Sequence, residues 1–508
     1  MDGQSHSSQP GGNTGLRIFS QAAKHGRCPN MHDDNVKALE YAARRGVSYR
    51  RSGGLASAHA RASAGELRAL FDIGIPEEGR EPTQVIDDLI DAAEPGLIGN
   101  IRPDFYGWVM GASHAVGVAA DWLTSSWGQN AAIYQTSPAA AIAEEVAGAW
   151  LLDLLKLPEQ SSVGFTTGAT MASFICLAAA RSEVLASAGW DLEVEGLNGA
   201  PTINVLISDE AHSSVWAALR YLGFGRKNHV GIACDDQGRM RIDDLAHKLA
   251  EHEGPKIIIC QAGHINSGAL DRFVDIAELA REHGAWLHVD GAFGLWANCV
   301  PRLKHLCEGV ERADSWAVDG HKWLQIPYDS GFAIVKNSCA HKRAMDNTAS
   351  YLNKSAGDGR NPTEFVPELS RRARGFAVWS VIQALGRQGI REIVSRHCTC
   401  AAHLSRILKS EPGISIMNDV CLNQISLSLG SDLPGEMQEV MTNEFLGEIE
   451  RCEGPFLRPA KWKGRTIVRI SVISSDTGTE RIEELGRIIA RAWRKIRARH
   501  LATEYCRA

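Results

Sequence analysis

Four short segments of this 508-residue chain carry side chains that could act together on one small molecule. The first is the run Asp319–Gly–His321–Lys322–Trp, which follows an apolar stretch expected to be a buried strand. A lysine held there between His and Trp side chains can lose its solvent and keep its amine neutral and nucleophilic, as Schiff-base chemistry requires. A solitary lysine is more often a surface residue, so this interpretation depends on the other three segments.

Those segments supply an acid, a histidine and a helix start made of small residues. Asp290 closes the apolar run Trp286–Asp290, where a poorly solvated carboxylate needs a cation or hydrogen bonds. His212 follows another such run, and the loop before Thr170 opens a helix whose free N–H groups could hold an anion. Each has an ordinary alternative: a loop-fixing aspartate, a structural or capping histidine, and a plain helix N-cap. The loop is neither a P-loop nor GxGxxG.

Along the chain the order is the small-residue loop before Thr170, then His212, Asp290 and Lys322. With its motifs DEAHSS, HVDGAFG and DGHKW, the chain resembles the pyridoxal-phosphate-dependent group II amino-acid decarboxylases, the family of aromatic-L-amino-acid and glutamate decarboxylases. The resemblance runs from about residue 35 to the C-terminal strand Val468–Val472. It implies a fold-type I α/β enzyme with a mostly parallel seven-stranded sheet, and pyridoxal 5'-phosphate as the cofactor.

The resemblance also implies a role for each matching residue. Lys322 would hold the cofactor as a Schiff base, Asp290 would pair with the pyridine nitrogen, and His212 would stack on the ring; these three are the expected catalytic residues. Asp319 departs from the asparagine that some relatives have, so its role stays open. No metal is expected. The expected cofactor-binding residues are Ala169, Thr170, His212, Asp290, Ala292, Asp319, His321 and Lys322.

The substrate implied is an L-amino acid that loses its α-carboxylate as carbon dioxide. An aromatic side chain is the first expectation. An acidic amino acid is an alternative, since the sequence does not identify an arginine anchor. Core packing is the alternative for at least half of the residues expected to line the side-chain pocket, which are Phe105, Trp108, Val109, Met110, Gly111 and Tyr134.

One loop departs from the family pattern. Relatives of the aromatic type carry a proton-donating tyrosine just before an Arg-Arg pair, and its loss in relatives is linked to aldehyde formation. Aligning Arg371–Arg372 puts Asn361 or Pro362 at that position, and Tyr351 lies about ten residues earlier. Retention of His212 favours simple decarboxylation. An aldehyde synthase is the alternative, and a catalytically silent relative that only binds the cofactor is a minor one.

Strands and helices alternate in the part of the chain that must position these residues. Short, partly β-branched apolar runs between turn signals are typical of strands buried on both faces of a parallel sheet, whose carboxyl ends build the site. We expect a disordered tail at 1–15, an N-terminal helical segment at 16–104, a large cofactor-binding α/β domain at 105–385 and a small α+β domain at 386–508. The expected strands include Ile203–Ser208, Lys256–Gln261, Ala285–Asp290, Ser315–Val318, Phe332–Val335, Asn423–Leu429 and Thr466–Val472.

Composition excludes several other classes of protein. Hydrophobic residues make up 44% and charged residues 22%, as in ordinary globular proteins, and the net charge of −6 gives no basic field for nucleic acid or membrane. The polar N-terminus lacks the apolar core of a signal peptide. The 12 cysteines are scattered, which fits a reducing compartment. We therefore expect a cytoplasmic enzyme without nucleic-acid or membrane partners and, from the resemblance, a homodimer.

Overall fold

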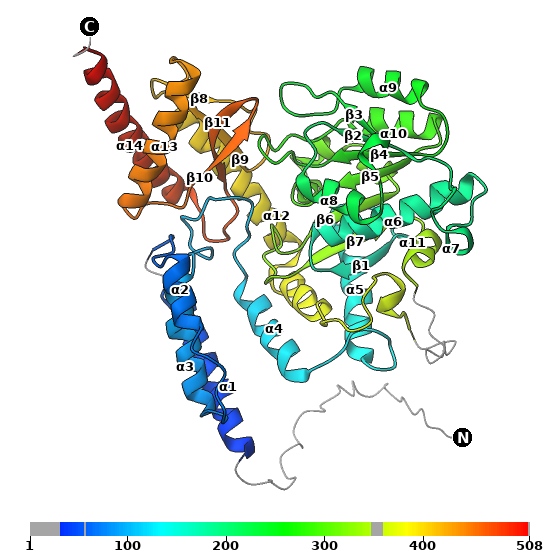
Figure 1. Cartoon of the computed structure of the whole chain (residues 1–508), viewed down its shortest axis with the longest axis horizontal. Coiled ribbons are helices and arrows are strands. Elements are labelled where there is room, and N and C mark those ends of the chain that lie inside the picture. The colour runs from blue at the N-terminus through cyan, green and yellow to red at the C-terminus, as the bar shows by residue number, and fades with distance from the viewer. Residues whose placement is uncertain (1–30, 55–56, 347–358, 506–508) are drawn as a thin grey trace, which may run out of the picture. The chain divides into compact units, whose positions relative to one another are not determined.

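The computed structural model describes residues 31–54, 57–346 and 359–505, so the predicted tail at 1–15 and Tyr351 lie outside the described residues. The chain divides into two compact units. One comprises residues up to Ser52 together with Ala62–Gly96, and the other comprises Gly53–Arg61 together with the chain from Leu97 onward. Figure 1 labels their helices and strands.

The described part of the first unit is helical. It contains α1 (Met31–Arg51), α2 (Ala64–Phe71) and α3 (Pro82–Ala93). Ser63 and Glu66 form a capping box at the start of α2, which satisfies two backbone N–H groups that the helix cannot pair itself. The α1 and α3 helices pack together, and Arg45 of α1 forms an ion pair with Asp87 of α3 at 3.1 Å.

A seven-stranded sheet with the order β1-β7-β6-β5-β4-β2-β3 forms the centre of the second unit (Figure 1). Only β7 runs antiparallel to its neighbours, so the predicted mostly parallel seven-stranded α/β sheet is confirmed. Neither β1 nor β3 was among the expected strands. The strands are β1 (Ser162–Thr166), β2 (Asn204–Ser208), β3 (His229–Ile232), β4 (Lys256–Gln261), β5 (Trp286–Asp290), β6 (Ser315–Asp319) and β7 (Gly331–Val335).

Alternate residues of each strand enter two separate cores, because successive side chains of a strand point to opposite faces. Leu206 belongs to one core and Val205 to the other. The first core is closed by α5 (Pro138–Leu155), α9 (Ile242–Glu251), α10 (Phe273–Glu282) and part of α12 (Gly375–Leu408). The second is closed by α6 (Ala169–Ser187), α8 (Ser213–Tyr221) and α11 (Ser338–Met345).

The helix α6 is very apolar, and most of it is buried in the core of the second unit. Among the described helices it alone is long and apolar enough to cross a membrane, yet 67% of its most apolar window is buried inside the protein. It packs against β5, β6 and β7. We therefore interpret its apolar composition as the requirement of a core helix that is covered on most sides.

A four-stranded antiparallel sheet of order β10-β11-β9-β8 follows α12. The helix α12 is interrupted at Gly386, where φ is 60°, a conformation that favours glycine. The expected strands near 423–429 and 466–472 correspond to β9 and β11, whereas β8 and β10 were not predicted. The elements are β8 (Ile414–Ile416), β9 (Gln424–Leu429), α13 (Gly435–Arg451), β10 (Arg458–Trp462), β11 (Arg465–Ser471) and α14 (Thr479–Tyr505).

Candidate active site

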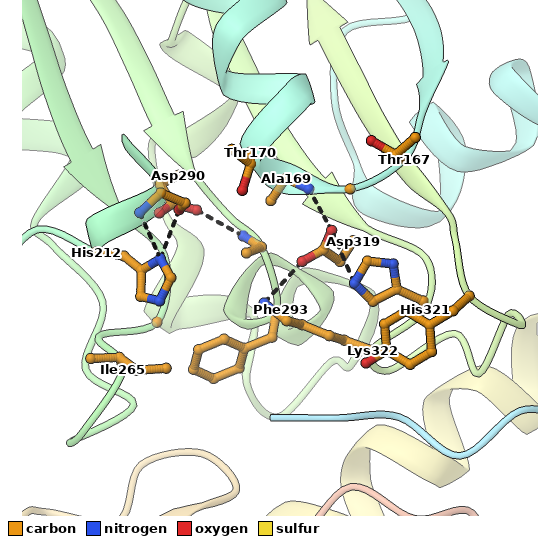
Figure 2. A pocket seen from close by; sticks show the side chains of 15 residues that line it. Thr167, Ala169, Thr170, His212, Ile265, Asp290, Phe293, Asp319, His321 and Lys322 are labelled. Carbon is orange, nitrogen blue, oxygen red and sulfur yellow. Dashed lines mark hydrogen bonds and ion pairs between the residues drawn. The ribbon is translucent and has the colours of Figure 1, made fainter. Parts of the chain in front are cut away.

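A cavity of ≈ 350 Å³ lies where β5 and β6 end and α6 begins (Figure 2). Asp290 is the last residue of β5 and Asp319 the last of β6, so the parallel strands bring both carboxylates to one edge of the sheet. All eight predicted cofactor-binding residues line this cavity. The lining residues are Thr167, Gly168, Ala169, Thr170, His212, Ser214, Gly263, Ile265, Asp290, Ala292, Phe293, Asp319, His321, Lys322 and Tyr328.

Lys322 points into the cavity, and its amine is paired with an acid. Nζ lies 2.9 Å from Oδ2 of Asp319, and the side chain is 18% exposed. The other oxygen of Asp319 accepts the backbone N–H of Ala169 at 2.6 Å and lies 3.5 Å from Nε2 of His321. The carboxylate of Asp319 therefore joins the lysine to the N-terminal end of α6, as the dashed lines of Figure 2 show.

Asp290 is buried without a cation at ion-pair distance among the residues that the structure describes. Its carboxylate accepts the N–H of Ala292 at 3.2 Å. Burial raises the pKa of Asp290, while the charges of His212 and Lys322 oppose that rise. A buried carboxylate of this kind is suited to bind a protonated ring nitrogen of a ligand.

His212 has both a structural role and a place in the cavity. It is the N-cap of α8: its Nδ1 accepts the N–H of Ser214 at 3.3 Å and lies 2.7 Å from the Ser214 hydroxyl. Burial lowers the pKa of His212, so the neutral ring predominates at pH 7. Figure 2 shows the ring beside Asp290, facing the cavity.

The start of α6 brings backbone close to the lysine loop. A Cβ atom at Gly168 would lie 3.0 Å from Cε1 of His321 and 3.3 Å from Oδ1 of Asp319, so a larger residue would crowd the site. An enclosed amine, a buried acid without a cation, a histidine ring and a small-residue helix start together fit pyridoxal phosphate. Asp319 departs from this fit, because its carboxylate already accepts the Ala169 N–H. Its negative charge would also repel a phosphate group bound at this helix start.

The expected substrate-pocket residues do not line this cavity within one chain. Phe105 stacks on Phe456 with ring centroids 4.5 Å apart, and Met110 packs on the same cluster. Val109 belongs to the first core, while Trp108 is 44% exposed. The predicted homodimer has a second subunit that a single chain does not contain, so the prediction of the pocket residues stays untested.

Gly111 and Tyr134 have different positions. A Cβ atom at Gly111 would lie 2.3 Å from the carbonyl oxygen of Lys322, so this segment passes directly behind the lysine. The N–H of Tyr134 donates to Oδ1 of Asn361 at 3.0 Å, and Pro362 is buried. The two residues aligned with the loop tyrosine of relatives therefore belong to a packed segment.

Seven lining residues were absent from the predicted site, among them Ile265, Phe293 and Tyr328. The ring of Tyr328 stacks on His321, with centroids 4.4 Å apart. Partial burial raises the pKa of Tyr328 to about 12, so its hydroxyl keeps its proton at pH 7. Phe293 lies within the quoted motif HVDGAFG, and Tyr328 follows the lysine by six positions, so proximity in sequence was the available signal.

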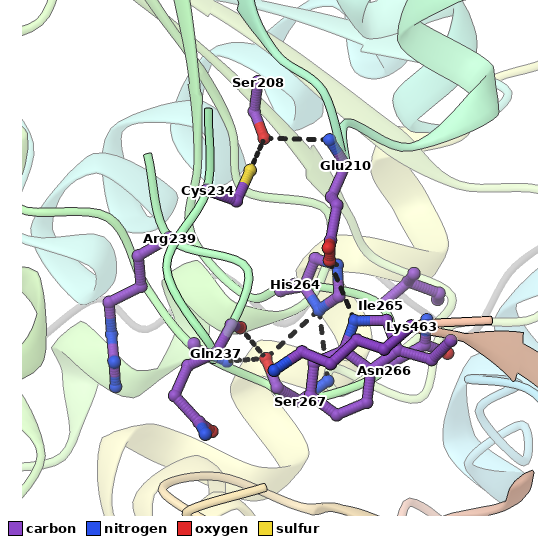
Figure 3. A network of polar contacts seen from close by, with 12 residues as sticks. Ser208, Glu210, Cys234, Gln237, Arg239, His264, Ile265, Asn266, Ser267 and Lys463 are labelled. Atoms are coloured by element: carbon purple, nitrogen blue, oxygen red, sulfur yellow. Dashed lines mark hydrogen bonds and ion pairs between the residues drawn. The ribbon is translucent and has the colours of Figure 1, made fainter. Parts of the chain in front are cut away.

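A polar network ties the loop of His212 to the rest of the second unit (Figure 3). Oε2 of Glu210 lies 3.0 Å from Nε2 of His264 and accepts the indole N–H of Trp462 at 2.8 Å. Nδ1 of His264 accepts the N–H of Ser267 at 3.2 Å, so the proton is assigned to Nε2, facing Glu210. The neighbours of His264 in the chain, Gly263 and Ile265, line the cavity.

Arg469 is a cation near the site that the sequence analysis did not identify. One terminal nitrogen of its side chain donates to the carbonyl oxygen of Ile265 and to Oδ1 of Asn266, both at 3.4 Å. Loss of solvent lowers the pKa of Arg469 to about 10, and its charge lowers the pKa of His212. Within the described ranges it has no carboxylate partner.

Comparisons with known proteins agree with this geometry. A family model, the pyridoxal-dependent decarboxylase conserved domain, matches residues 64–429. An aromatic-L-amino-acid decarboxylase from Bacillus atrophaeus is 26% identical over 82% of this chain and 87% of the relative, and a phenylacetaldehyde synthase from Arabidopsis thaliana is 24% identical over 84% and 89%. The crystal structure of Oryza sativa TDC with PLP and tryptamine superposes with a TM-score of 0.85 at 20% identity, covering 93% of this chain and 100% of the other.

Proposed function

Because the chain belongs to the pyridoxal-dependent decarboxylase family, we propose that it removes the α-carboxylate of an aromatic L-amino acid, giving an amine and carbon dioxide. The cofactor is pyridoxal phosphate. The observation that carries the proposal is that Lys322 and Asp290 line one cavity, with the lysine largely enclosed. Among the described residues, no cation lies at ion-pair distance from Asp290.

Pyridoxal phosphate, when bound, accepts the electron pair that is released as the bond to the departing carboxylate breaks. The chain supplies attachment and orientation. Lys322 offers its ε-amine, Asp290 would keep the pyridine nitrogen protonated, and the ring of His212 would cover one face of the cofactor. The apolar side chains of Ile265 and Phe293 help to exclude water from the same cavity.

The proton that completes an amine product needs a donor, and Tyr328 is our candidate. Its hydroxyl is protonated at pH 7 and its side chain lines the cavity next to His321. Asn361 and Pro362, at the aligned position of the loop tyrosine, offer no acidic proton. Simple decarboxylation is therefore favoured over aldehyde synthesis, provided that Tyr328 supplies this proton.

Arg469 favours a second candidate substrate, an acidic L-amino acid. Its guanidinium is largely removed from solvent, has no carboxylate partner among the described residues, and contacts Ile265 at the cavity wall. A side-chain carboxylate that reached this cation would gain a charge-assisted hydrogen bond. The aromatic proposal stays first because relatives named aromatic-L-amino-acid decarboxylases match most of this chain.

Assembly as a cytoplasmic homodimer belongs to the same proposal. Large apolar side chains of α4 (Ala115–Trp127) are exposed in the single chain, among them Trp122, Leu123 and Trp127. A second copy that covered them would remove this apolar surface from water. Light scattering of the purified protein measures the mass directly; a monomer would refute the dimer.

The deciding experiment is a panel of L-amino acids assayed for carbon dioxide, amine, aldehyde and peroxide. We expect turnover of Trp, Tyr, Phe or DOPA, with the amine as the main product. The Lys322→Ala variant should lose both turnover and the absorbance of the bound cofactor. Turnover of only Asp, Glu or cysteine sulfinate would replace the aromatic proposal with the acidic one, and no turnover of any amino acid would refute both.

A further inference from the structure

A second hollow, which we call the arginine groove, lies between α12, the segment Val300–Arg302 and the first residue of α14, Thr479. Its volume is ≈ 650 Å³, and it shares no residue with the cofactor cavity. We propose that the arginine groove binds a small phosphorylated molecule. The lining residues are Val300, Pro301, Arg302, Gln388, Arg391, Glu392, Ser395, Arg396, Thr399, Cys400 and Thr479.

Three guanidinium groups line the groove, and none has a carboxylate partner in the described parts of the chain. Arg302 donates to the hydroxyl and carbonyl oxygens of Ser395 and to the hydroxyl of Thr399, at 2.8 to 3.3 Å. Arg391 donates through Nε to the carbonyl of Cys299 at 2.9 Å. Arg396 donates to backbone carbonyls of the segment before α14. Neutral oxygens therefore fix the side chains without cancelling their charge.

The single carboxylate in the lining does not neutralise these arginines. Oε1 of Glu392 accepts the amide N–H of Gln388 at 2.8 Å, and Glu392 forms no ion pair within the described ranges. Arg391 uses only its Nε, so its two terminal nitrogens have no protein acceptor among the described residues. The groove thus holds an excess of positive charge together with unused donors.

The unused donors of the arginine groove are suited to bind a phosphate group. Planar guanidinium groups bind the oxygens of phosphate in pairs, and the hydroxyls of Ser395, Thr399 and Thr479 add neutral hydrogen-bonding groups. Thr479 begins the long helix α14, so the positive end of its dipole also lies at the groove. The volume is within the range of about 300 to 1,000 Å³ that is typical of small-molecule sites, so a phosphate ester with an organic part fits better than the bare ion.

The test uses the full chain loaded with pyridoxal phosphate, so that the cofactor cavity is already filled. Isothermal titration calorimetry at low ionic strength measures binding of ADP, glycerol phosphate, inorganic phosphate and sulfate, with sodium chloride matched for ionic strength. We expect saturable binding of a phosphate ester, tighter than that of sulfate. The double variant Arg391→Gln/Arg396→Gln should weaken it about tenfold or more. Arg487→Gln removes an exposed charge of α14, paired with Glu484, and should change affinity less than about twofold.

A further variant keeps the proposal testable if the double variant does not fold. Gln388→Glu adds a negative charge to the groove, removes no arginine contact and alters an exposed side chain. It should weaken the phosphate ester to a similar degree, with an unchanged cofactor absorbance. Lack of saturable binding to the unaltered enzyme would overturn the proposal, as would unchanged affinity in Gln388→Glu or an equal loss in Arg487→Gln.

Discussion

The carboxylate of Asp319 accepts a backbone N–H at the start of α6, where the cofactor phosphate is expected to bind. We therefore expect that replacing Asp319 with a neutral residue tightens cofactor binding. Oδ1 of Asp319 accepts the N–H of Ala169 at the start of α6, and Oδ2 pairs with the amine of Lys322 at 2.9 Å. In Asp319→Asn an amide oxygen still accepts the Ala169 N–H, but the negative charge is gone. The amine of Lys322 also loses its ion pair with this carboxylate.

The size of the effect follows from charge and distance. Two unit charges about 4 Å apart interact by about 4 kcal/mol at an effective dielectric constant of about 20. The positive amine of Lys322 offsets part of this repulsion, so we expect a gain of about 1.4 to 2.8 kcal/mol, which is a ten- to hundredfold lower Kd for pyridoxal phosphate. Asp319 is only 3% exposed, so solvent screens the interaction weakly.

The assay is a titration of cofactor-free protein with pyridoxal phosphate, followed by absorbance. Asp243→Asn is the matched control, because it removes an exposed carboxylate that pairs with Arg241. Neither residue of this pair lines the cofactor cavity. The control should leave Kd unchanged. An Asp319→Asn protein that folds normally and binds the cofactor no more tightly than the unaltered chain would refute the argument from repulsion.

Three other predictions test separate features. Tyr328→Phe should raise the proportion of aldehyde and peroxide relative to amine, as product assays would detect; an unchanged ratio contradicts its role as proton donor. Arg371→Met leaves Glu144 as a buried unpaired acid and should cost about 3 to 5 kcal/mol in chemical unfolding, whereas Arg372→Met, in an exposed pair, should cost about 1 kcal/mol or less. Burial lowers the pKa of His288, His341 and His397 to about 3, so protons bind preferentially to the unfolded chain. Stability should therefore fall by about 1.4 kcal/mol per histidine per pH unit below about 6.5; a flat profile between pH 6.5 and 5 contradicts this.

The parts of the site that the sequence predicted are those at the ends of strongly apolar strands. Asp290 and Lys322 each follow such a run, and the parallel sheet brings the ends of these runs together. The strand β3 was missed because its sequence HVGI contains a histidine and a glycine, which weaken the apolar pattern. β10 was missed because Pro459 and two cations interrupt it.

Other features of the site depend on contacts that local patterns do not encode. The bond from Ala169 to Asp319 joins residues 150 positions apart, and it exists only because α6 starts beside the end of β6. Arg469 reaches Ile265 across 204 positions, from one sheet to a loop of the other. A motif identifies the residues of one loop, but it does not identify a cation that a distant part of the chain supplies.

The link between Glu210 and Trp462 has a consequence for recombining this enzyme with its relatives. Chimeras made at a boundary near Gly386 would import a foreign C-terminal sheet against the native loop Asp209–His212. Without a donor at the position of Trp462, the carboxylate of Glu210 would keep its contact with His264 but lose the hydrogen bond that ties this loop to β10. Successful grafts should therefore inherit both sides of this contact from one parent.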